Sequence, residues 1–290
     1  MPHIPKEYLD LAVYIYATKA RAERGEPETT VGGSGFLVGV PFSFPAPPGH
    51  GHLYAVTCAH VVEDLPVSYL RVNNTHTGLP MVEAVAREGW FVHPDGADVA
   101  VAPLDFDDSV GIIALQPELF LTQEIVDRFA VGLGDETFTV GRFVNHEGKQ
   151  KNVPTVRFGN ISMMPSEPVQ AERRSQISYL VETRSQSRYS GSPVFVYLTP
   201  GMPRFVGDGP QSHFLTGQGP WCLGITWCYL NSEKPNTFGH LQDFQTGLTG
   251  VLPIKRLEEL LATEAVVNAR TVGEKAYRER HPDHESPETQ

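Results

Sequence analysis

Cysteine is scarce in this sequence, and basic residues are outnumbered by acidic ones. The 290 residues include three cysteines, Cys58, Cys222 and Cys228, an odd number without the spacing of a metal-binding motif. Such cysteines are expected to be small buried hydrophobes in a reducing compartment, so we expect a cytoplasmic protein without disulfides. The formal net charge of −11 argues against a broad nucleic-acid-binding face and favours solubility.

Long hydrophobic runs are also lacking. No window approaches the roughly eighteen consecutive apolar residues of a membrane-spanning helix, so no membrane partner is expected. Charged residues (Lys6, Glu7 and Asp10) interrupt the N-terminal segment where a secretory leader would need an apolar core. Glycine (27) and proline (24) are abundant instead, which is typical of many short strands joined by turns. At this length the sequence predicts one large all-β domain or two smaller units that share a cleft.

Apolar, β-branched and aromatic runs bounded by turn residues predict two series of strands. The first series lies at residues 11–17, 31–40, 53–56, 66–72, 80–86, 89–93 and 98–103. The second series lies at residues 137–141, 155–159, 177–183, 193–198, 222–229 and 246–253. Residues 104–130 lose the alternation, which predicts a crossover between two halves with a helical turn near 122–129.

Helical periodicity is clear only near the C-terminus, where apolar residues predict one helix over 254–269. The charged tail that follows has no apolar period and is predicted to be disordered. We therefore divide the chain into a first half (1–118), a second half with the C-terminal helix (119–270) and a disordered tail (271–290). Residues 199–220, which are rich in Gly and Pro, are expected to form an insertion.

Three polar residues stand where predicted strands begin or end. His60 follows one strand, Asp98 opens another, and Ser190 lies in the turn Arg188-Tyr189-Ser190-Gly191-Ser192-Pro193 before a third. A serine hydroxyl is a weak nucleophile at neutral pH unless a histidine takes its proton and a carboxylate orients that histidine. Because each of the three would be held on a rigid strand end, they are candidates for nucleophilic hydrolysis.

Neighbouring residues offer alternatives for two of these roles. Asp95 lies three residues before Asp98, but in a Pro-Asp-Gly turn, where aspartate is commonly structural. The serines close to Ser190 are Ser185, Ser187 and Ser192. Only Ser190 is followed by Gly-Ser-Pro and an apolar strand, and only His60 among the eleven histidines lies in a strand-Thr-x-Ala-His context. The sequence therefore favours His60, Asp98 and Ser190.

Four motifs together resemble the trypsin-like serine peptidases. They are Gly-Ser-Gly-Phe-Leu at 33–37, Ala-Val-Thr-Cys-Ala-His at 55–60, Asp-Val-Ala-Val at 98–101 and Ser-Gly-Ser-Pro at 190–193. Their order is that of chymotrypsin, and the lack of disulfides is similar to the bacterial HtrA-like branch, here without a PDZ segment. The resemblance covers residues 10–262.

The resemblance implies an all-β fold of two six-stranded antiparallel barrels with a C-terminal helix. Ser190 of the second barrel would attack a peptide carbonyl, while His60 and Asp98 of the first would act as the base and its orienting group. The backbone N–H groups of Arg188 and Ser190 would bind the oxyanion. The resemblance implies no metal and no cofactor, and its partners would be a protein or peptide substrate and a regulatory protein.

Substrate preference and catalytic competence depend on two arginines. The family position at the base of the primary pocket is Arg184, with Thr226 and Trp227 in the pocket wall, so a basic floor would favour acidic substrates. Alternatively, this loop is built differently and Arg184 is solvated. The family usually has glycine where this chain has Arg188, which leaves open a catalytically silent double barrel that binds peptides or acts as a scaffold. A hydrolase of esters or other acyl substrates with the same triad is a third reading.

Overall fold

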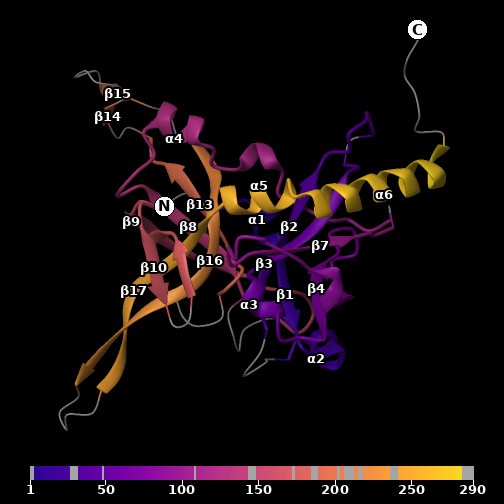
Figure 1. The fold of residues 1–290 in the computed structure, drawn as a ribbon, viewed down its shortest axis with the longest axis horizontal. Helices are drawn as coiled ribbons and strands as arrows, with labels where there is room; N and C mark the ends of the chain where they lie inside the picture. Colours follow the sequence, from indigo (N-terminus) through magenta and orange to yellow (C-terminus); the bar gives the residue numbers. More distant parts are fainter. Residues whose placement is uncertain are drawn as a thin grey trace.

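The computed structural model describes residues 3–26, 32–47, 49–107, 109–142, 148–171, 174–183, 189–200, 203–205, 212–214, 218–235 and 241–282. The described chain is mostly β and forms two halves, with a long helix running across both (Figure 1). All strand pairs within the two main sheets are antiparallel. The all-β prediction is therefore confirmed.

The first half is one seven-stranded sheet in the order β5-β4-β1-β2-β3-β7-β6. Its elements are α1 (Lys6–Asp10), β1 (Ala12–Tyr16), α2 (Lys19–Arg24), β2 (Gly33–Val40), β3 (His52–Thr57), α3 (Ala59–Val62), β4 (Val67–Asn73), β5 (Pro80–Ala86), η1 (Arg87–Gly89), β6 (Phe91–Val92) and β7 (Ala100–Leu104). The sheet curls like part of a barrel, but it is not the closed six-stranded barrel that the family resemblance implied. All five residues of β1 are buried, because this central strand is covered on both faces.

The second half is a closed six-stranded barrel in the order β12-β17-β16-β13-β8-β9, as expected. Its elements are η2 (Pro117–Leu119), α4 (Gln123–Phe129), β8 (Glu136–Gly141), β9 (Thr155–Met163), β10 (Pro168–Ala171), β11 (Arg174–Ile177), β12 (Tyr179–Thr183), β13 (Pro193–Leu198), β14 (Pro203–Phe205), β15 (Ser212–Phe214), β16 (Gln218–Pro235) and β17 (Leu241–Pro253). The crossover lies between Leu115, which bridges to Val38 of β2, and Phe120, which bridges to Cys222 of β16.

The barrel core is aromatic, and the N-terminal helix contributes to it. The rings of Phe138 (β8) and Phe195 (β13) stack with their centroids 5.0 Å apart. Tyr8 of α1 meets Phe195 edge-on at 5.0 Å, so the N-terminal segment packs on the second half although β1 belongs to the first. Edge-to-face pairs of this kind contribute about 0.5–1.5 kcal/mol beyond their buried area.

The C-terminal helices follow the last strand of the second half, and the second of them packs against the first half. The chain forms α5 (Lys255–Leu261) and then α6 (Glu264–Arg280), and α6 crosses from the barrel to the loop between β2 and β3 (Figure 1). There the Tyr277 ring contacts Phe42 and Phe44 at centroid distances of 4.6 and 6.2 Å. The helix corrects the prediction of a disordered tail for residues 271–280. This segment without apolar periodicity is held by side-chain contacts such as the Tyr277 ring and the Ser43 N–H, which donates to Glu274 at 2.8 Å.

A buried arginine joins the halves on another side. Arg71 of β4 is fully buried and donates to the carbonyl oxygens of Gly148 (2.9 Å) and Lys149 (2.8 Å). It also donates to Asn152 Oδ1 at 2.9 Å, and the Asn152 side chain returns a bond to the Arg71 carbonyl at 2.7 Å. The connection between β8 and β9 is thus docked onto the first sheet.

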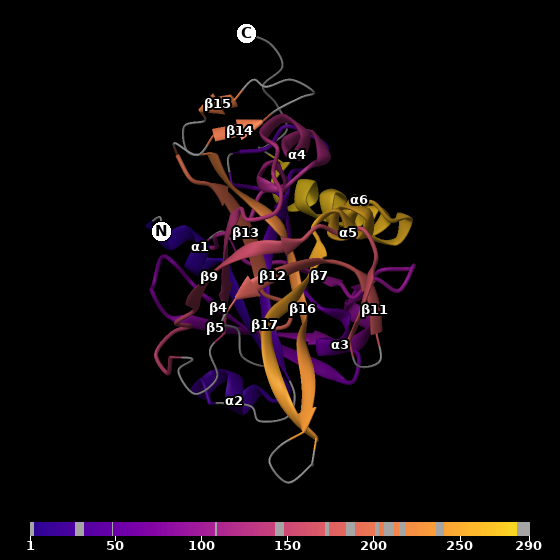
Figure 2. The same ribbon diagram turned by 90° about the vertical axis from the view of Figure 1, so that its left-hand side faces the viewer.

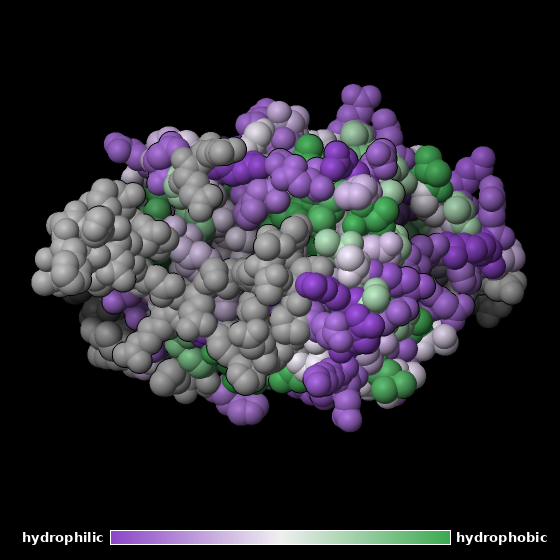
Figure 3. All heavy atoms as spheres, turned by 90° about the horizontal axis from the view of Figure 1, so that it is seen from below, coloured by the Kyte–Doolittle hydropathy of each residue, from purple (hydrophilic) through white to green (hydrophobic). Residues whose placement is uncertain are grey.

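The hairpin of β16 and β17 extends beyond the barrel. The two strands pair from Gly224 with Pro253 out to Pro235 with Leu241, whereas β12 pairs with β17 only from Val251 to Leu248. The outer part of the hairpin therefore projects as a two-stranded ribbon (Figure 2). The face seen from below is largely hydrophilic over the described residues, with hydrophobic ones in small groups (Figure 3). No described helix has the length and apolar character needed to cross a membrane.

Candidate active site

His60 is presented by the single turn of α3, directly after β3. Ala59, Val61 and Val62 of that turn are buried, so His60 is the residue of α3 that faces outward. The preceding Thr57 is buried and its hydroxyl donates to the carbonyl oxygen of Ser34 at 2.7 Å, which fixes the end of β3 against β2. The His60 side chain is 33% exposed and is therefore accessible to a substrate.

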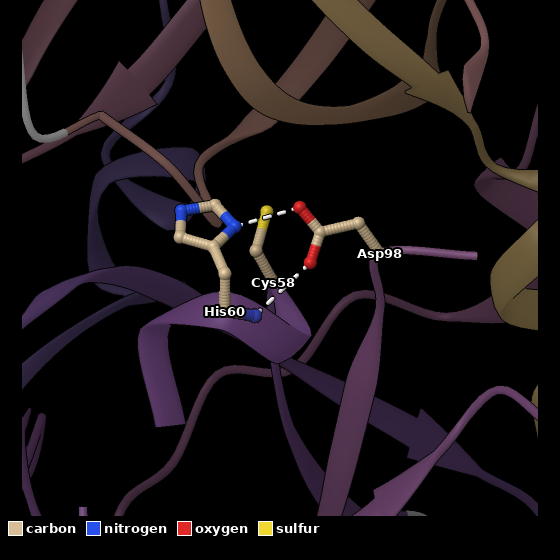
Figure 4. Close-up of side chains that lie close together, drawn as sticks. All are labelled: Cys58, His60 and Asp98. Atoms are coloured by element: carbon tan, nitrogen blue, oxygen red, sulfur yellow. Dashed lines mark hydrogen bonds and ion pairs between the residues drawn. The ribbon is translucent and has the colours of Figure 1, made fainter. Parts of the chain in front are cut away.

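Asp98 is buried beneath His60 and binds it twice (Figure 4). Its Oδ2 lies 2.6 Å from His60 Nδ1, and its Oδ1 accepts the His60 backbone N–H at 3.0 Å. Because an ionised carboxylate only accepts hydrogen bonds, Nδ1 carries the proton and Nε2 is free to act as a base. Burial alone would raise the pKa of Asp98, but the hydrogen bonds and charge of His60, with Arg174, lower it below its usual value. The carboxylate is thus ionised at neutral pH.

The competing Asp95 belongs to the turn that delivers Asp98. The backbone N–H of Asp95 donates to Nδ1 of the buried His93 at 3.2 Å, and Gly96 closes the turn with a positive φ of 76°. No described hydrogen bond or ion pair joins the Asp95 side chain to His60. The structure therefore brings Asp98, and not Asp95, together with His60.

Ser190 lies in a tight turn at the start of β13. Ser192 N–H donates to the Tyr189 carbonyl at 2.8 Å and Gly191 N–H donates to the Thr226 carbonyl at 2.8 Å. Gly191 has φ +89°, and a Cβ there would lie 2.0 Å from the carbonyl oxygen of Ser34. Only glycine fits this combination of left-handed backbone and close approach.

The Ser190 turn is attached to the strand pair that positions His60. Ser34 N–H donates to the Ser190 carbonyl at 3.0 Å, and the Ser34 carbonyl accepts from Thr57, three residues before His60. The Ser34 hydroxyl accepts the Arg142 backbone N–H at 2.9 Å. Ser34 is thus a fully buried junction between β2, β3, β8 and the nucleophile turn. The Gly-Ser-Gly motif contains this residue, but the sequence does not reveal its three partners.

The Ser190 hydroxyl is partly exposed and bonds weakly to its own barrel. Its Oγ donates to the Trp227 carbonyl at 3.4 Å, which is long for an O–H donor. No hydrogen bond of the described residues joins Ser190 to His60, and the Ser190 backbone N–H has no acceptor among them. No described group therefore occupies the Ser190 N–H. Arg188, the other residue expected to bind the oxyanion, lies outside the described residues.

The buried Tyr189 side chain anchors the turn that contains Ser190, a role that the sequence does not reveal. It is buried, its hydroxyl contacts Thr155, and Arg157 Nε donates to that hydroxyl at 2.9 Å. The Tyr189 backbone N–H donates to the Tyr229 hydroxyl at 3.1 Å. An aromatic residue beside the nucleophile therefore ties the turn to β9 and β16.

Two of the residues expected in the primary pocket have buried side chains. The Thr226 hydroxyl lies within hydrogen-bonding distance of the carbonyl oxygens of Tyr189 (2.8 Å) and Ser192 (2.9 Å), to either of which it can donate. The Trp227 indole donates to Ser178 Oγ at 2.8 Å. Both side chains are engaged inside the protein, so at these two positions the backbone is the part open to a ligand. Arg184 lies outside the described residues, so its role stays a prediction.

Cys58 completes a compact polar group with His60 and Asp98, whose ligand-type atoms all lie within 4.8 Å of one another. Three such side chains could in principle hold a cation. However, the Cys58 thiol is buried and donates to the Thr226 carbonyl at 3.1 Å. Burial, with the nearby Asp98 charge, raises its pKa well above the usual value, so the thiolate that a metal needs is disfavoured. We assign no metal to this group.

No protein-family model matches the sequence, and no curated protein matches it either. Among solved structures, the apo protease domain of MamO from Magnetospirillum magneticum is 15% identical, over 89% of this chain and 98% of that chain, with a TM-score of 0.49. The inactive form of the Rv3671c protease is 13% identical over 89% of both chains, with a TM-score of 0.46. A mutant inactive form of Rv3671c from M. tuberculosis H37Rv gives the same identity and TM-score, over 89% of this chain and 86% of that chain. Fold similarity does not establish chemistry, which the site residues must support.

Proposed function

We propose that this protein is a serine-type endopeptidase in which Ser190, His60 and Asp98 cleave peptide bonds. The observation that carries the proposal is the His60–Asp98 pair, with Nδ1 and Oδ2 2.6 Å apart, Asp98 fully buried and His60 partly exposed. Such a pair fixes the tautomer in which Nε2 faces outward as a base. The proposal needs neither metal nor cofactor.

The reaction would proceed in two acyl transfers. Ser190 Oγ attacks the substrate carbonyl carbon while His60 Nε2 takes the hydroxyl proton, and the Ser190 N–H stabilises the developing oxyanion. His60 then passes that proton to the leaving amine as the C–N bond breaks, which leaves an acyl-enzyme. A water molecule, deprotonated by His60, hydrolyses the ester and regenerates the serine.

Substrate would bind along β16 beside Ser190. The ladder of β16 with β17 shifts register between Thr226 and Cys228, and the Trp227 carbonyl there accepts the long bond from Ser190. An extended peptide could donate a backbone N–H to this carbonyl, since exposed strand edges bind peptides in this way. A protein or peptide in extended conformation is therefore the proposed substrate.

Labelling with a fluorophosphonate tests the proposal. This probe reacts with a serine only when a base activates it, so the wild-type protein should be labelled and Ser190→Ala should not. His60→Ala should also abolish labelling, whereas Ser192→Ala should retain it, because the buried Ser192 hydroxyl is not part of the triad. Labelling that persists in Ser190→Ala would end the proposal.

One observation favours a second candidate, a silent double barrel that binds peptides without cutting them. Ser190 donates to the Trp227 carbonyl and not to His60, so the described geometry is not that of an activated nucleophile. Hydrogen bonds in catalytic sites often tighten only when substrate binds, which is why we prefer the first candidate. A peptide that binds with saturation but is never cleaved, by a protein that the probe leaves unlabelled, would establish the second.

A further inference from the structure

The hairpin of β10 and β11 reaches from the second half to the His60–Asp98 pair of the first. Arg174 of β11 places Nη1 3.7 Å from Asp98 Oδ1 and Nη2 2.5 Å from Glu63 Oε2. Two residues further along, Gln176 Nε2 donates to the Gly96 carbonyl at 3.0 Å. One short hairpin thus contacts both the residue that pairs with His60 and the turn that leads to it.

We propose that Arg174 is a positioning residue that holds Asp98 in place and reduces the negative field that Asp98 exerts on His60, with Glu63 limiting the effect. This inference rests on the proposed function, because it assigns to Arg174 a part in tuning the same base. The contact joins the two halves, so it also depends on how the barrel sits against the first sheet.

The two carboxylates that Arg174 contacts, Asp98 and Glu63, differ in their distance from it and in their exposure to solvent. The separation of 3.7 Å from Asp98 is an ion-pair distance and too long for a hydrogen bond, so the effect on Asp98 is Coulombic. The Asp98 side chain is 0% exposed, and charges interact strongly where water is excluded. The Glu63 side chain is 45% exposed, and its pair with Arg174 is weakened by solvent. Arg174 therefore acts mainly on Asp98.

The charges around His60 act on it with opposite signs. Asp98 favours the imidazolium form, the positive charge of Arg174 opposes it, and the negative charge of Glu63 offsets part of Arg174. Among the described residues the Cys58 thiol also lies close to the ring, and it is neutral because burial raises its pKa. Removing Arg174 and removing Glu63 should therefore shift the protonation of His60 in opposite directions, which a purely structural role would not do.

The experiment follows the His60 imidazole by NMR across pH in Arg174→Gln and Glu63→Gln. In Arg174→Gln the midpoint should move to higher pH, by on the order of half a unit or more, because the field of Asp98 is no longer opposed. In Glu63→Gln the His60 midpoint should move to lower pH, and the shift should be smaller than in Arg174→Gln because solvent screens the charge of Glu63. The acidic limb of the pH profile of kcat/KM should move in the same directions.

Two control variants separate charge from docking. Arg174→Lys keeps the positive charge and should restore a midpoint close to that of the wild type. Gln176→Ala removes the neutral hydrogen bond of the same hairpin to Gly96 and should leave the midpoint unchanged. If Gln176→Ala shifts the midpoint as much as Arg174→Gln does, hairpin docking is the cause and the proposal is wrong.

Failure of this inference can be distinguished from failure of the proposed function. The NMR titration requires no turnover, so opposite shifts would support Arg174 even in a protein that the fluorophosphonate does not label. A His60 midpoint that stays fixed in both variants, or moves in the same direction in both, would overturn the inference even in an active peptidase.

Discussion

Two buried serines near the nucleophile turn should differ sharply when each is replaced by alanine. Ser34 and Ser192 are both 0% exposed and both contact this turn. The Ser34 hydroxyl accepts the buried N–H of Arg142 at 2.9 Å, whereas the Ser192 hydroxyl has no partner among the described residues. Ser34→Ala leaves the buried Arg142 N–H without its acceptor, which should lower the free energy of unfolding by about 1–3 kcal/mol. Ser192→Ala removes an unpaired hydroxyl from an apolar site and should be neutral or stabilising.

Thermal and urea unfolding of the two variants measure this difference. In a protein of this size each kcal/mol corresponds to about 2–4 °C, so Ser34→Ala should lower Tm by several degrees. The urea m-value should stay unchanged, because neither substitution alters the surface exposed on unfolding. Two results would refute the reasoning. Ser192→Ala could lower the free energy of unfolding as much as Ser34→Ala does, or the free energy of unfolding of Ser34→Ala could lie within about 0.5 kcal/mol of the wild-type value.

Three further predictions follow from local geometry. Gly191→Ala should fold, but its rate of fluorophosphonate labelling should fall about 100-fold or more because Ser190 is displaced. Gly96→Ala, which also has a positive φ (76°) but has open space around it, should retain labelling. Tyr277→Ala should expose the C-terminal end of α6 to limited proteolysis, while Tyr277→Phe, which keeps the ring contacts, should stay resistant. Burial alone would raise the pKa of Glu274, but hydrogen bonds from Ser43 and His52 lower that pKa below its usual value. A carboxyl with a lower pKa in the folded state contributes stability that is lost as pH falls through that value. Acid should therefore loosen α6, as followed by the same proteolysis, and Glu274→Gln should flatten this dependence.

The strands and the His60–Asp98 pair could be predicted from the sequence because their signals are local. Runs of apolar residues between turn residues gave nearly every barrel strand, and β13 is buried at all six positions. Asp98 opens such a run and lies two residues before β7, which pairs with β3, so its proximity to His60 follows once both strands are placed.

The features that the sequence does not reveal depend on contacts between distant polar residues. Strand β11 has the largely polar sequence Arg-Ser-Gln-Ile at 174–177, which shows no apolar alternation, and yet it carries the arginine beside Asp98. Fully buried Arg71 would be read as a surface residue from its type alone. Its burial depends on carbonyl groups of a segment 77 and 78 residues away. Seven strand runs are predicted for the first half, but their number does not show that β5 and β6 are the two edges of an open sheet.

For the proposed triad, the junction between the halves is expected to matter more than the resting position of the serine hydroxyl. The 3.4 Å bond from Ser190 to Trp227 is long, and a partly exposed serine changes rotamer within picoseconds to nanoseconds, so this bond cannot hold the hydroxyl in place. The backbone of Ser190 is different, because Ser34 fixes its carbonyl to the first half at 3.0 Å. Cys58 joins the same halves through the Thr226 carbonyl at 3.1 Å. Since the base lies on one side of these bonds and the nucleophile on the other, a change that moves one half against the other should lower activity far more than its cost in stability suggests.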